Sequence, residues 1–238
     1  MGRASYQAKR RPLSHTARSN VASMPTPHAC HAMHASSLID TAAAPAACEP
    51  APAGEEDLFE AAVLFTDMRG SSDLVTRTAP REFFRLLNAS LSAQAECVRG
   101  FEGDVVKYTG DGLMAVFRGM GRSSLALRCA LALARTCEGD QRLPFGIGVA
   151  DGPVLAGFVG PDAPAERRHY DVVGATVHLA ARLCAMAAAG EVLTTTSTHD
   201  TAQLPAAALR PMGPVAVPGF PEAIECVAFE RGAATASL

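Results

Sequence analysis

The chain has 238 residues and a formal net charge of −3 at pH 7, with 48% hydrophobic and 19% charged residues. This composition is typical of a globular protein, and the near-balanced charge gives no reason to expect a nucleic-acid partner. The seven cysteines are odd in number and form no C-x-x-C pair. They favour core thiols in a reduced, cytoplasmic compartment over a disulfide framework. Arg128 and Arg135 interrupt the most apolar stretch, so we expect no membrane span.

Composition divides the chain into three parts. Residues 1–56 are rich in alanine, serine, proline and histidine, with no acidic residue before Asp40. Such a segment buries too little apolar surface to offset its ordering entropy, which predicts a disordered tail. Its basic residues are also compatible with a transit peptide, and a start of translation at Met24 or Met33 is a further alternative. We expect a folded domain over residues 57–232 and a short C-terminal tail over residues 233–238.

From residue 57 onward, the hydrophobic pattern alternates between strand and helix periods. Strands are expected at Ala61–Thr66, Glu191–Thr196 and Ile224–Phe229, and helices at Pro80–Val98, Ser123–Cys137 and Thr176–Ala188. Turn residues predict a hairpin of Asp104–Thr109 with Leu113–Phe117, and a second of Phe145–Ala150 with Val154–Val159. This order of elements predicts an α+β chain folded as a ferredoxin-like α/β sandwich with additional elements.

Two aspartates, Asp67 and Asp111, each follow a short apolar run that reads as a strand. A buried carboxylate is costly unless a cation or hydrogen-bond donors compensate it. A pair of carboxylates beside a glycine-containing loop is what a site for divalent metal and polyphosphate requires. Taken singly, Asp67 is also compatible with a helix cap and Asp111 with a turn residue.

Three separated motifs contain these aspartates and further charged residues. They are Phe65-Thr-Asp67-Met-Arg-Gly-Ser-Ser72, Lys107-Tyr-Thr-Gly-Asp111 and Tyr170-Asp171-Val-Val-Gly-Ala-Thr-Val-His178-Leu-Ala-Ala-Arg182. Together, and in this order, they resemble the catalytic domain of class III adenylate/guanylate cyclases over roughly Leu58 to Glu230. The resemblance implies a ferredoxin-like sandwich of the class III nucleotidyl cyclase type, paired head to tail with nucleotide sites at the dimer interface.

The resemblance implies a two-metal site and a phosphate-binding loop. Asp67, Asp111 and the Met68 carbonyl would be ligands of two Mg²⁺ or Mn²⁺ ions per site. The loop of Met68, Arg69, Gly70, Ser71 and Ser72 would place backbone N–H groups against the β and γ phosphates, with Gly70 allowing the close approach.

The same resemblance implies how the nucleotide is recognised and turned over. Lys107 would donate to adenine N1 and Asp171 would accept from the 6-amino group, whereas guanylate cyclases of the family carry Glu and Cys there. A site that hydrogen-bonds one base leaves buried groups unpaired with the other, so the pair favours ATP. Arg182 stands at the family's transition-state arginine, one helical turn after His178, which would hold the ribose.

The chain departs from the family pattern in three places. His178 replaces the usual ribose-orienting asparagine, and Ser71-Ser72 replaces the common Phe-Thr. Pro218, which has neither charge nor N–H, stands where the family has a triphosphate-binding lysine. Arg210 or Arg69 is a candidate to compensate for that loss.

The leading hypothesis is an adenylate cyclase, a phosphorus–oxygen lyase that converts ATP into 3′,5′-cyclic AMP and pyrophosphate as a homodimer. One alternative is a catalytically weak or inactive cyclase-homology module that binds nucleotide and regulates a partner, which His178 and Pro218 favour. A further alternative is a diguanylate cyclase, although the chain offers only Gly110-Asp111-Gly112 where those enzymes carry a longer signature turn.

Overall fold

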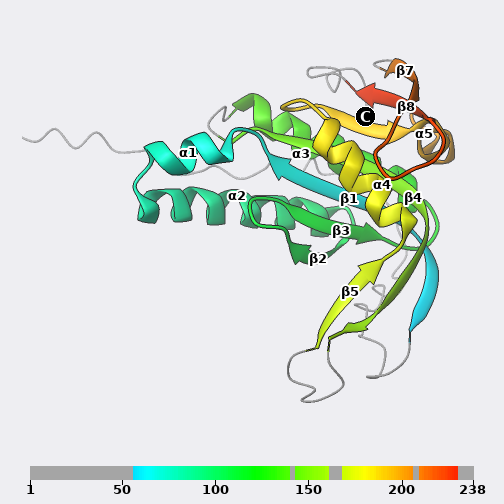
Figure 1. Cartoon of the computed structure of the whole chain (residues 1–238), viewed down its shortest axis with the longest axis horizontal. Helices are drawn as coiled ribbons and strands as arrows, with labels where there is room; N and C mark the ends of the chain where they lie inside the picture. The colour runs from blue at the N-terminus through cyan, green and yellow to red at the C-terminus, as the bar shows by residue number, and fades with distance from the viewer. Residues whose placement is uncertain (1–55, 140–142, 161–167, 206–208, 230–238) are drawn as a thin grey trace, which may run out of the picture. The chain divides into compact units, whose positions relative to one another are not determined.

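The computed structural model describes residues 56–139, 143–160, 168–205 and 209–229, which form eight strands and five helices (Figure 1). In chain order the elements are β1 (Asp57–Met68), α1 (Ser71–Arg77), α2 (Pro80–Gly100), β2 (Asp104–Tyr108), β3 (Leu113–Phe117), α3 (Arg122–Gly139), β4 (Phe145–Val159), β5 (His169–Val173), α4 (Ala175–Met186), β6 (Val192–Thr195), α5 (Thr196–Ala202), β7 (Leu209–Val215) and β8 (Ile224–Phe229). The predicted N-terminal tail, apart from Glu56, and the predicted C-terminal tail lie outside the described residues.

All eight strands belong to one sheet, in the order β2-β3-β1-β4-β6-β8-β7, with β5 paired to β4. The central strand β1 runs antiparallel to both of its neighbours, β3 and β4. With α2 connecting β1 to the β2–β3 hairpin and α3 connecting that hairpin to β4, these elements form a βαββαβ unit. The predicted ferredoxin-like α/β sandwich is therefore confirmed, and β6, β8 and β7 extend its sheet beyond β4.

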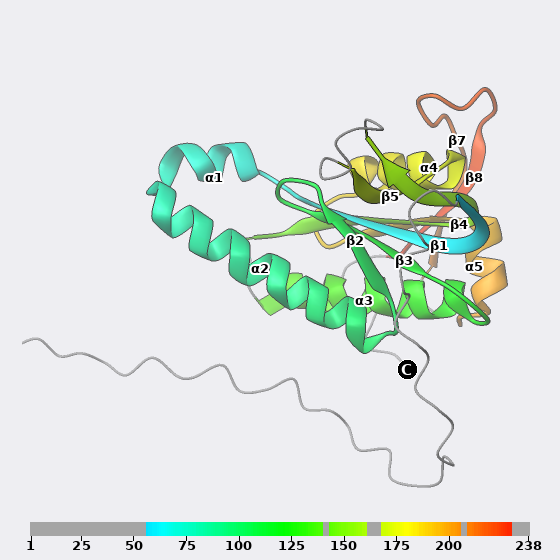
Figure 2. The ribbon, with the colours of Figure 1, turned by 90° about the horizontal axis from the view of Figure 1, so that it is seen from below.

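Alternate residues of β1 supply two hydrophobic cores, one on each face of the sheet. Ala62 and Leu64 belong to the core that α2 and α3 cover, whereas Ala61 and Val63 belong to the core that α4 covers. Side chains of a strand alternate between faces, so a strand covered on both sides is apolar throughout. Figure 2 shows α4 on one face of the sheet and α2 and α3 on the other.

Most elements predicted from periodicity are present, with ends shifted by a few residues. The helix predicted from Pro80 begins there, with the proline in the first turn, where its missing N–H has no cost. The β2–β3 hairpin is closed by the N–H of Thr109, which donates to Gly112 O at 2.9 Å. Of the five cysteines in the described part of the chain, four are buried and Cys97 is half-buried, all as free thiols, which confirms core thiols there.

The prediction of a hairpin between Phe145–Ala150 and Val154–Val159 was wrong. These residues form one strand, β4, which pairs with β1 continuously from Phe145↔Met68 to Ala156↔Asp57. Pro153 lies between the stretch that pairs with β6 and the stretch that pairs with β5. Because proline has no N–H to donate, it is tolerated in a strand at a point where one side has no strand neighbour.

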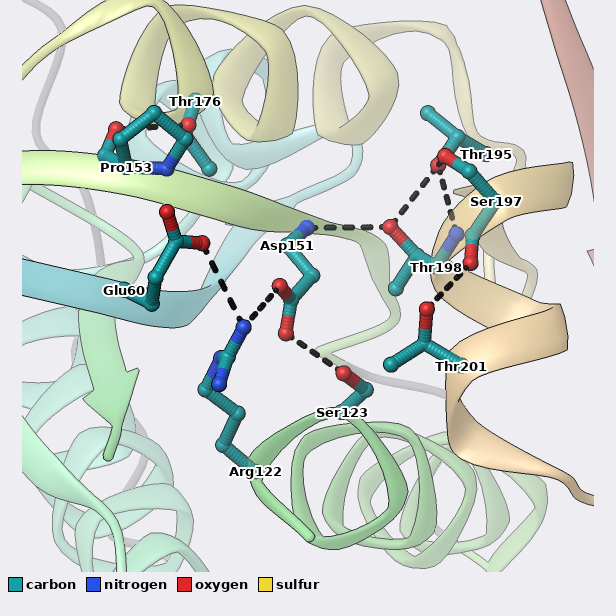
Figure 3. Close-up of polar contacts among 10 residues, drawn as sticks. All are labelled: Glu60, Arg122, Ser123, Asp151, Pro153, Thr176, Thr195, Ser197, Thr198 and Thr201. Carbon is teal, nitrogen blue, oxygen red and sulfur yellow. Dashed lines mark hydrogen bonds and ion pairs between the residues drawn. The ribbon is translucent and has the colours of Figure 1, made fainter. Parts of the chain in front are cut away.

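A polar network surrounds Asp151 of β4 at the point where a turn was expected (Figure 3). The half-buried Asp151 carboxylate accepts hydrogen bonds from Arg122 at 2.9 Å and from Ser123 at 2.5 Å, both at the start of α3. The backbone N–H of Asp151 donates to the Thr198 hydroxyl of α5 at 3.0 Å. These contacts come from residues distant in sequence, so tertiary packing overrides the local turn signal.

Four short elements were not predicted: α1, α5, β5 and β7. The strand β5 adds to the second half of β4, with Gly157 opposite Asp171 (Figure 1). In the part of the chain that the structure describes, no helix combines the length and apolar character needed to cross a membrane.

Candidate active site

The two predicted metal-binding aspartates lie on segments that pack against each other, the end of β1 and the β2–β3 turn. Asp67 is the next-to-last residue of β1, and Asp111 lies in the turn between β2 and β3. A Cβ atom added to Gly112 would lie 1.9 Å from Thr66 O and 3.1 Å from Asp67 Cα. Only glycine allows so close an approach of two backbones. The structure thus brings both carboxylates to one end of the sheet.

Arg69 binds Asp67 and the end of α4 at the same time. Its Nη1 donates to Asp67 Oδ2, its Nη2 donates to Cys184 O, and its Nε donates to Ala187 O at 3.0 Å. The last carbonyls of a helix have no partner within the helix, so the guanidinium satisfies two of them. In this structure Arg69 therefore connects β1 to the end of α4, and its predicted contact with phosphate stays a prediction.

The thiol beside this guanidinium stays protonated. Burial raises the pKa of Cys184 to about 12, although the positive charge of Arg69 opposes the shift. The Cys184 thiol donates to Gly146 O at 3.3 Å. A neutral thiol does not compete with Asp67 for a cation, because the thiolate is the metal ligand.

The residues at this end of the sheet fit a hard divalent cation. Among the described residues, neither Oδ1 of Asp67 nor the Asp111 carboxylate has a hydrogen-bond donor, so both are available. No group of three or more His, Cys, Asp or Glu side chains able to hold a metal ion occurs in residues 56–139, 143–160, 168–205 and 209–229. Mg²⁺ is commonly bound through one or two carboxylates, with substrate phosphates and water completing its shell. Two aspartates match that pattern.

The predicted phosphate loop leads from β1 into α1. Met68 is the last residue of β1 and is buried, whereas Ser71 and Ser72 form the first turn of α1. Gly70 adopts a left-handed conformation, with φ 75° and ψ 18°, which glycine adopts without strain. The residues predicted to face phosphates thus surround the start of a helix, where backbone N–H groups lack helical acceptors.

Lys107 and Asp171, predicted to recognise the base, form an ion pair. Lys107 Nζ lies 2.8 Å and 2.6 Å from the two oxygens of Asp171, whose side chain is 11% exposed. The N–H of Val172 donates to Asp171 Oδ1 at 2.8 Å. His169, which sequence reasoning missed, places Nε2 3.8 Å from Asp171 Oδ2. The alternation of strand side chains was the available signal, because His169 and Asp171 are two residues apart on β5.

His178 and Arg182 lie one turn apart on the exposed side of α4. They line a hollow of about 300 Å³ with Ala175 and the segment Pro218-Gly219-Phe220. The structure therefore brings together two of the departures from the expected pattern, His178 and Pro218. Neither Asp67, Asp111, Lys107 nor Asp171 lines this hollow. Arg210, a candidate to compensate for Pro218, donates to Glu191 Oε1 at 2.6 Å.

The chain belongs to the family of adenylate and guanylate cyclase catalytic domains, which it matches over residues 55–231. It is thus a class III nucleotidyl cyclase catalytic domain, as the three motifs predicted.

The chain is also similar to uncharacterized proteins of mycobacteria. It is 39% identical over 153 residues to one from Mycobacterium tuberculosis. The aligned region covers 62% of this chain and 26% of that protein. A second protein of the same species is 36% identical over 148 residues, 59% of this chain and 27% of its own length. The chain thus matches about a quarter of the length of these relatives.

Solved structures of cyclases share the fold. The adenylyl cyclase CyaB from P. aeruginosa has a TM-score of 0.67 at 23% identity, covering 74% of this chain and 96% of that one. The guanylate cyclase domain of RhGC from Catenaria anguillulae, solved with GTP, has a TM-score of 0.66 at 20% identity. The match covers 74% of this chain and 98% of that one. Both adenylyl and guanylyl cyclases therefore resemble the chain, and the fold does not distinguish between them.

Proposed function

We propose that this domain is an adenylate cyclase that converts ATP into 3′,5′-cyclic AMP and pyrophosphate as a homodimer. The observation that carries the proposal is the ion pair of Lys107 with Asp171. The lysine can donate to adenine N1 and the carboxylate can accept from the 6-amino group, whereas guanine presents the reverse pattern. The pair, rather than the fold, therefore supports ATP over GTP.

In the proposed reaction, the ribose 3′-oxygen bonds to the α-phosphorus while the bond from that phosphorus to the bridging oxygen of the β-phosphate breaks. The proton of the 3′-hydroxyl is released and ends on the pyrophosphate that leaves. Asp67, Asp111 and the Met68 carbonyl would hold two Mg²⁺ or Mn²⁺ ions. Such ions, when bound, would lower the pKa of the 3′-hydroxyl and neutralise the charge of the leaving pyrophosphate.

The remaining residues would bind and orient the nucleotide. Backbone N–H groups of Gly70, Ser71 and Ser72 would bind the β and γ phosphates. Arg182 would donate from its fixed, always charged fork to the α-phosphate oxygens, whose charge grows during the reaction. His178 would hold the ribose oxygen through one ring nitrogen.

The second candidate is a weak or inactive cyclase-homology module that binds nucleotide and regulates a partner. The observation that favours it is the hollow beside Arg182, because both His178 and Pro218 border it. A positive charge that would neutralise the triphosphate is missing at Pro218, and the bulk of histidine replaces the smaller asparagine amide. Both changes would weaken binding of the same nucleotide at one place.

The experiment that tests the proposal is a cyclase assay on the purified chain with ATP and GTP side by side, each with Mg²⁺ and with Mn²⁺. We expect cyclic AMP from ATP, little cyclic GMP from GTP, and no product from Asp67→Ala. Cyclic GMP as the main product would refute the assignment of ATP. No product above the Asp67→Ala control, from protein that still binds nucleotide, would favour the regulatory module.

A further inference from the structure

We propose that Thr66 and Gln94 are positioning residues that set the separation of the Asp67 and Asp111 carboxylates. This inference rests on the proposed metal-dependent function. It assigns a role to two side chains that are not predicted to touch metal or nucleotide. Neither side chain faces the nucleotide, because Thr66 is 1% exposed and Gln94 is 2% exposed.

The Thr66 hydroxyl links the end of β1, which carries Asp67, to the hairpin that carries Asp111. Thr66 directly precedes Asp67, and its Oγ1 accepts a hydrogen bond at 3.0 Å from the N–H of Leu113, two residues after Asp111. The pairing of β1 with β3 ends nearby, at Phe65↔Met114. Close to the end of the ladder, this side-chain hydrogen bond therefore joins β1 to the turn of the hairpin. The position of the turn that carries Asp111, relative to the end of β1 that carries Asp67, depends on this hydrogen bond.

Gln94 fixes the orientation of that hydroxyl. The Thr66 O–H donates to Gln94 Oε1 at 2.7 Å, and Gln94 Nε2 donates to Ser90 Oγ at 3.1 Å, one turn earlier on α2. A hydroxyl whose proton is engaged by Gln94 presents a lone pair to Leu113 N–H, so the two hydrogen bonds support each other. The chain of contacts thus runs from α2 through β1 to the β2–β3 turn.

The backbone contact at Gly112 makes the site sensitive to this link. Gly112 approaches Thr66 O so closely that no side chain fits between them. Because protein interiors are close-packed, a change in how Thr66 is held moves the turn containing Asp111 as a unit. Residues that orient metal ligands through hydrogen bonds typically contribute about 10- to 100-fold to metal affinity.

The test measures Mn²⁺ binding to the full chain by the loss of the free-ion signal in electron paramagnetic resonance, with no nucleotide present. Thr66→Val keeps the shape of the side chain and removes the hydroxyl. Gln94→Leu removes the oxygen that accepts the hydrogen bond from the Thr66 hydroxyl. We expect each to raise the Mn²⁺ dissociation constant by about tenfold or more. The double variant should be no worse than either single variant, because both remove the same link.

Three controls separate positioning from a general loss of structure. Thr66→Ser keeps the hydroxyl, so this variant should bind Mn²⁺ within about twofold of the unmodified chain. Thr194→Val is a matched control, because Thr194 is fully buried on β6 and its hydroxyl has no partner among the described residues. Far-ultraviolet circular dichroism establishes which variants are folded, and Gln94→Leu carries the test if Thr66→Val does not fold.

The outcomes distinguish this inference from the proposed function. If the unmodified chain and Asp67→Ala bind Mn²⁺ equally, Asp67 is not a ligand of the bound ion and the positioning role is contradicted, whereas the cyclase assay decides the proposed function separately. If Asp67→Ala loses binding while folded Thr66→Val or Gln94→Leu binds as tightly as the unmodified chain, the positioning role alone is overturned. An equal loss of Mn²⁺ affinity in Thr194→Val would also overturn the positioning role, because replacing any buried threonine would then have the same effect.

Discussion

At the scale of single residues, Arg69 shows how a charged side chain next to a site can serve the fold. Its guanidinium contacts Asp67 on β1 and two carbonyls at the end of α4. Positive charge is favourable at a helix C-terminus, where the partial charge of the carbonyls is negative. Arg69 therefore ties the helix that carries His178 and Arg182 to the strand that carries Asp67.

The Lys107–Asp171 pair leads to a prediction about base specificity. Replacing both residues, Lys107→Glu with Asp171→Cys, should raise the ratio of cyclic GMP to cyclic AMP formed by at least about tenfold. The reason is that each buried polar group left unpaired costs about 1–3 kcal/mol, so the matched base is favoured. The ratio is measured with equal concentrations of ATP and GTP.

The control for this prediction is Arg99→Glu with Asp104→Cys, which makes the same changes of charge at two exposed positions. It should leave the ratio as it is in the unmodified chain. An unchanged ratio in a folded, active Lys107→Glu, Asp171→Cys variant would remove the main support for ATP as the substrate.

At the scale of elements, the packing of α4 on β4 depends on a glycine. A Cβ atom at Gly148 would lie 2.2 Å from Cys184 N and 2.3 Å from Ala180 O, both backbone atoms of α4. Gly148 sits within the sheet, between Phe65 of β1 and Leu193 of β6. The absence of a side chain there is what allows the helix with His178 and Arg182 to lie directly on the strand.

We therefore predict that Gly148→Ala destabilises the domain by about 2 kcal/mol or more, because overpacking displaces a whole helix rather than a flexible side chain. Urea unfolding measures the change in free energy. Gly100→Ala is the matched control, since a Cβ atom there meets nothing within 4 Å. Equal stability of the two variants would show that α4 can shift away from β4 at little cost.

At the scale of the whole molecule, the predicted site residues form three separate groups within one chain. The aspartates lie at one end of the sheet, Lys107 and Asp171 pair between β2 and β5, and Arg182 borders the hollow on α4. Residues of one active site that do not converge within a chain can converge across a two-fold interface, where each chain contributes a different part. This arrangement supports the homodimer proposed above.

A shared site predicts complementation between two inactive variants. Asp67→Ala and Arg182→Ala should each be inactive alone. Mixed in equal amounts they should recover about one quarter of the unmodified activity, because half of the dimers are mixed and each has one intact site. The measurement is cyclic AMP production by co-expressed chains carrying different affinity tags. Isolated mixed dimers without activity would contradict a shared site.

Much of the local structure could be predicted because its signals lie within a few residues of one another. The amphipathic pattern of Phe83, Leu87 and Leu91 predicted α2, and the glycines around Asp111 predicted the β2–β3 hairpin. The same local logic failed at Asp151-Gly152-Pro153, where contacts with Arg122 and Thr198 keep β4 extended. Turn residues express a preference, and packing decides whether it is realised.

The sequence by itself determined the chemical kinds of side chain available, the order of the elements and the family to which the chain belongs. Only the tertiary structure decided which of those side chains meet: Arg69 with the end of α4, Thr66 with Gln94, and Pro218 with His178 and Arg182. The physical reason is that periodicity and turn preference act over a few residues. Contacts between distant segments arise from close packing of the whole sheet and its helices, which no local pattern encodes.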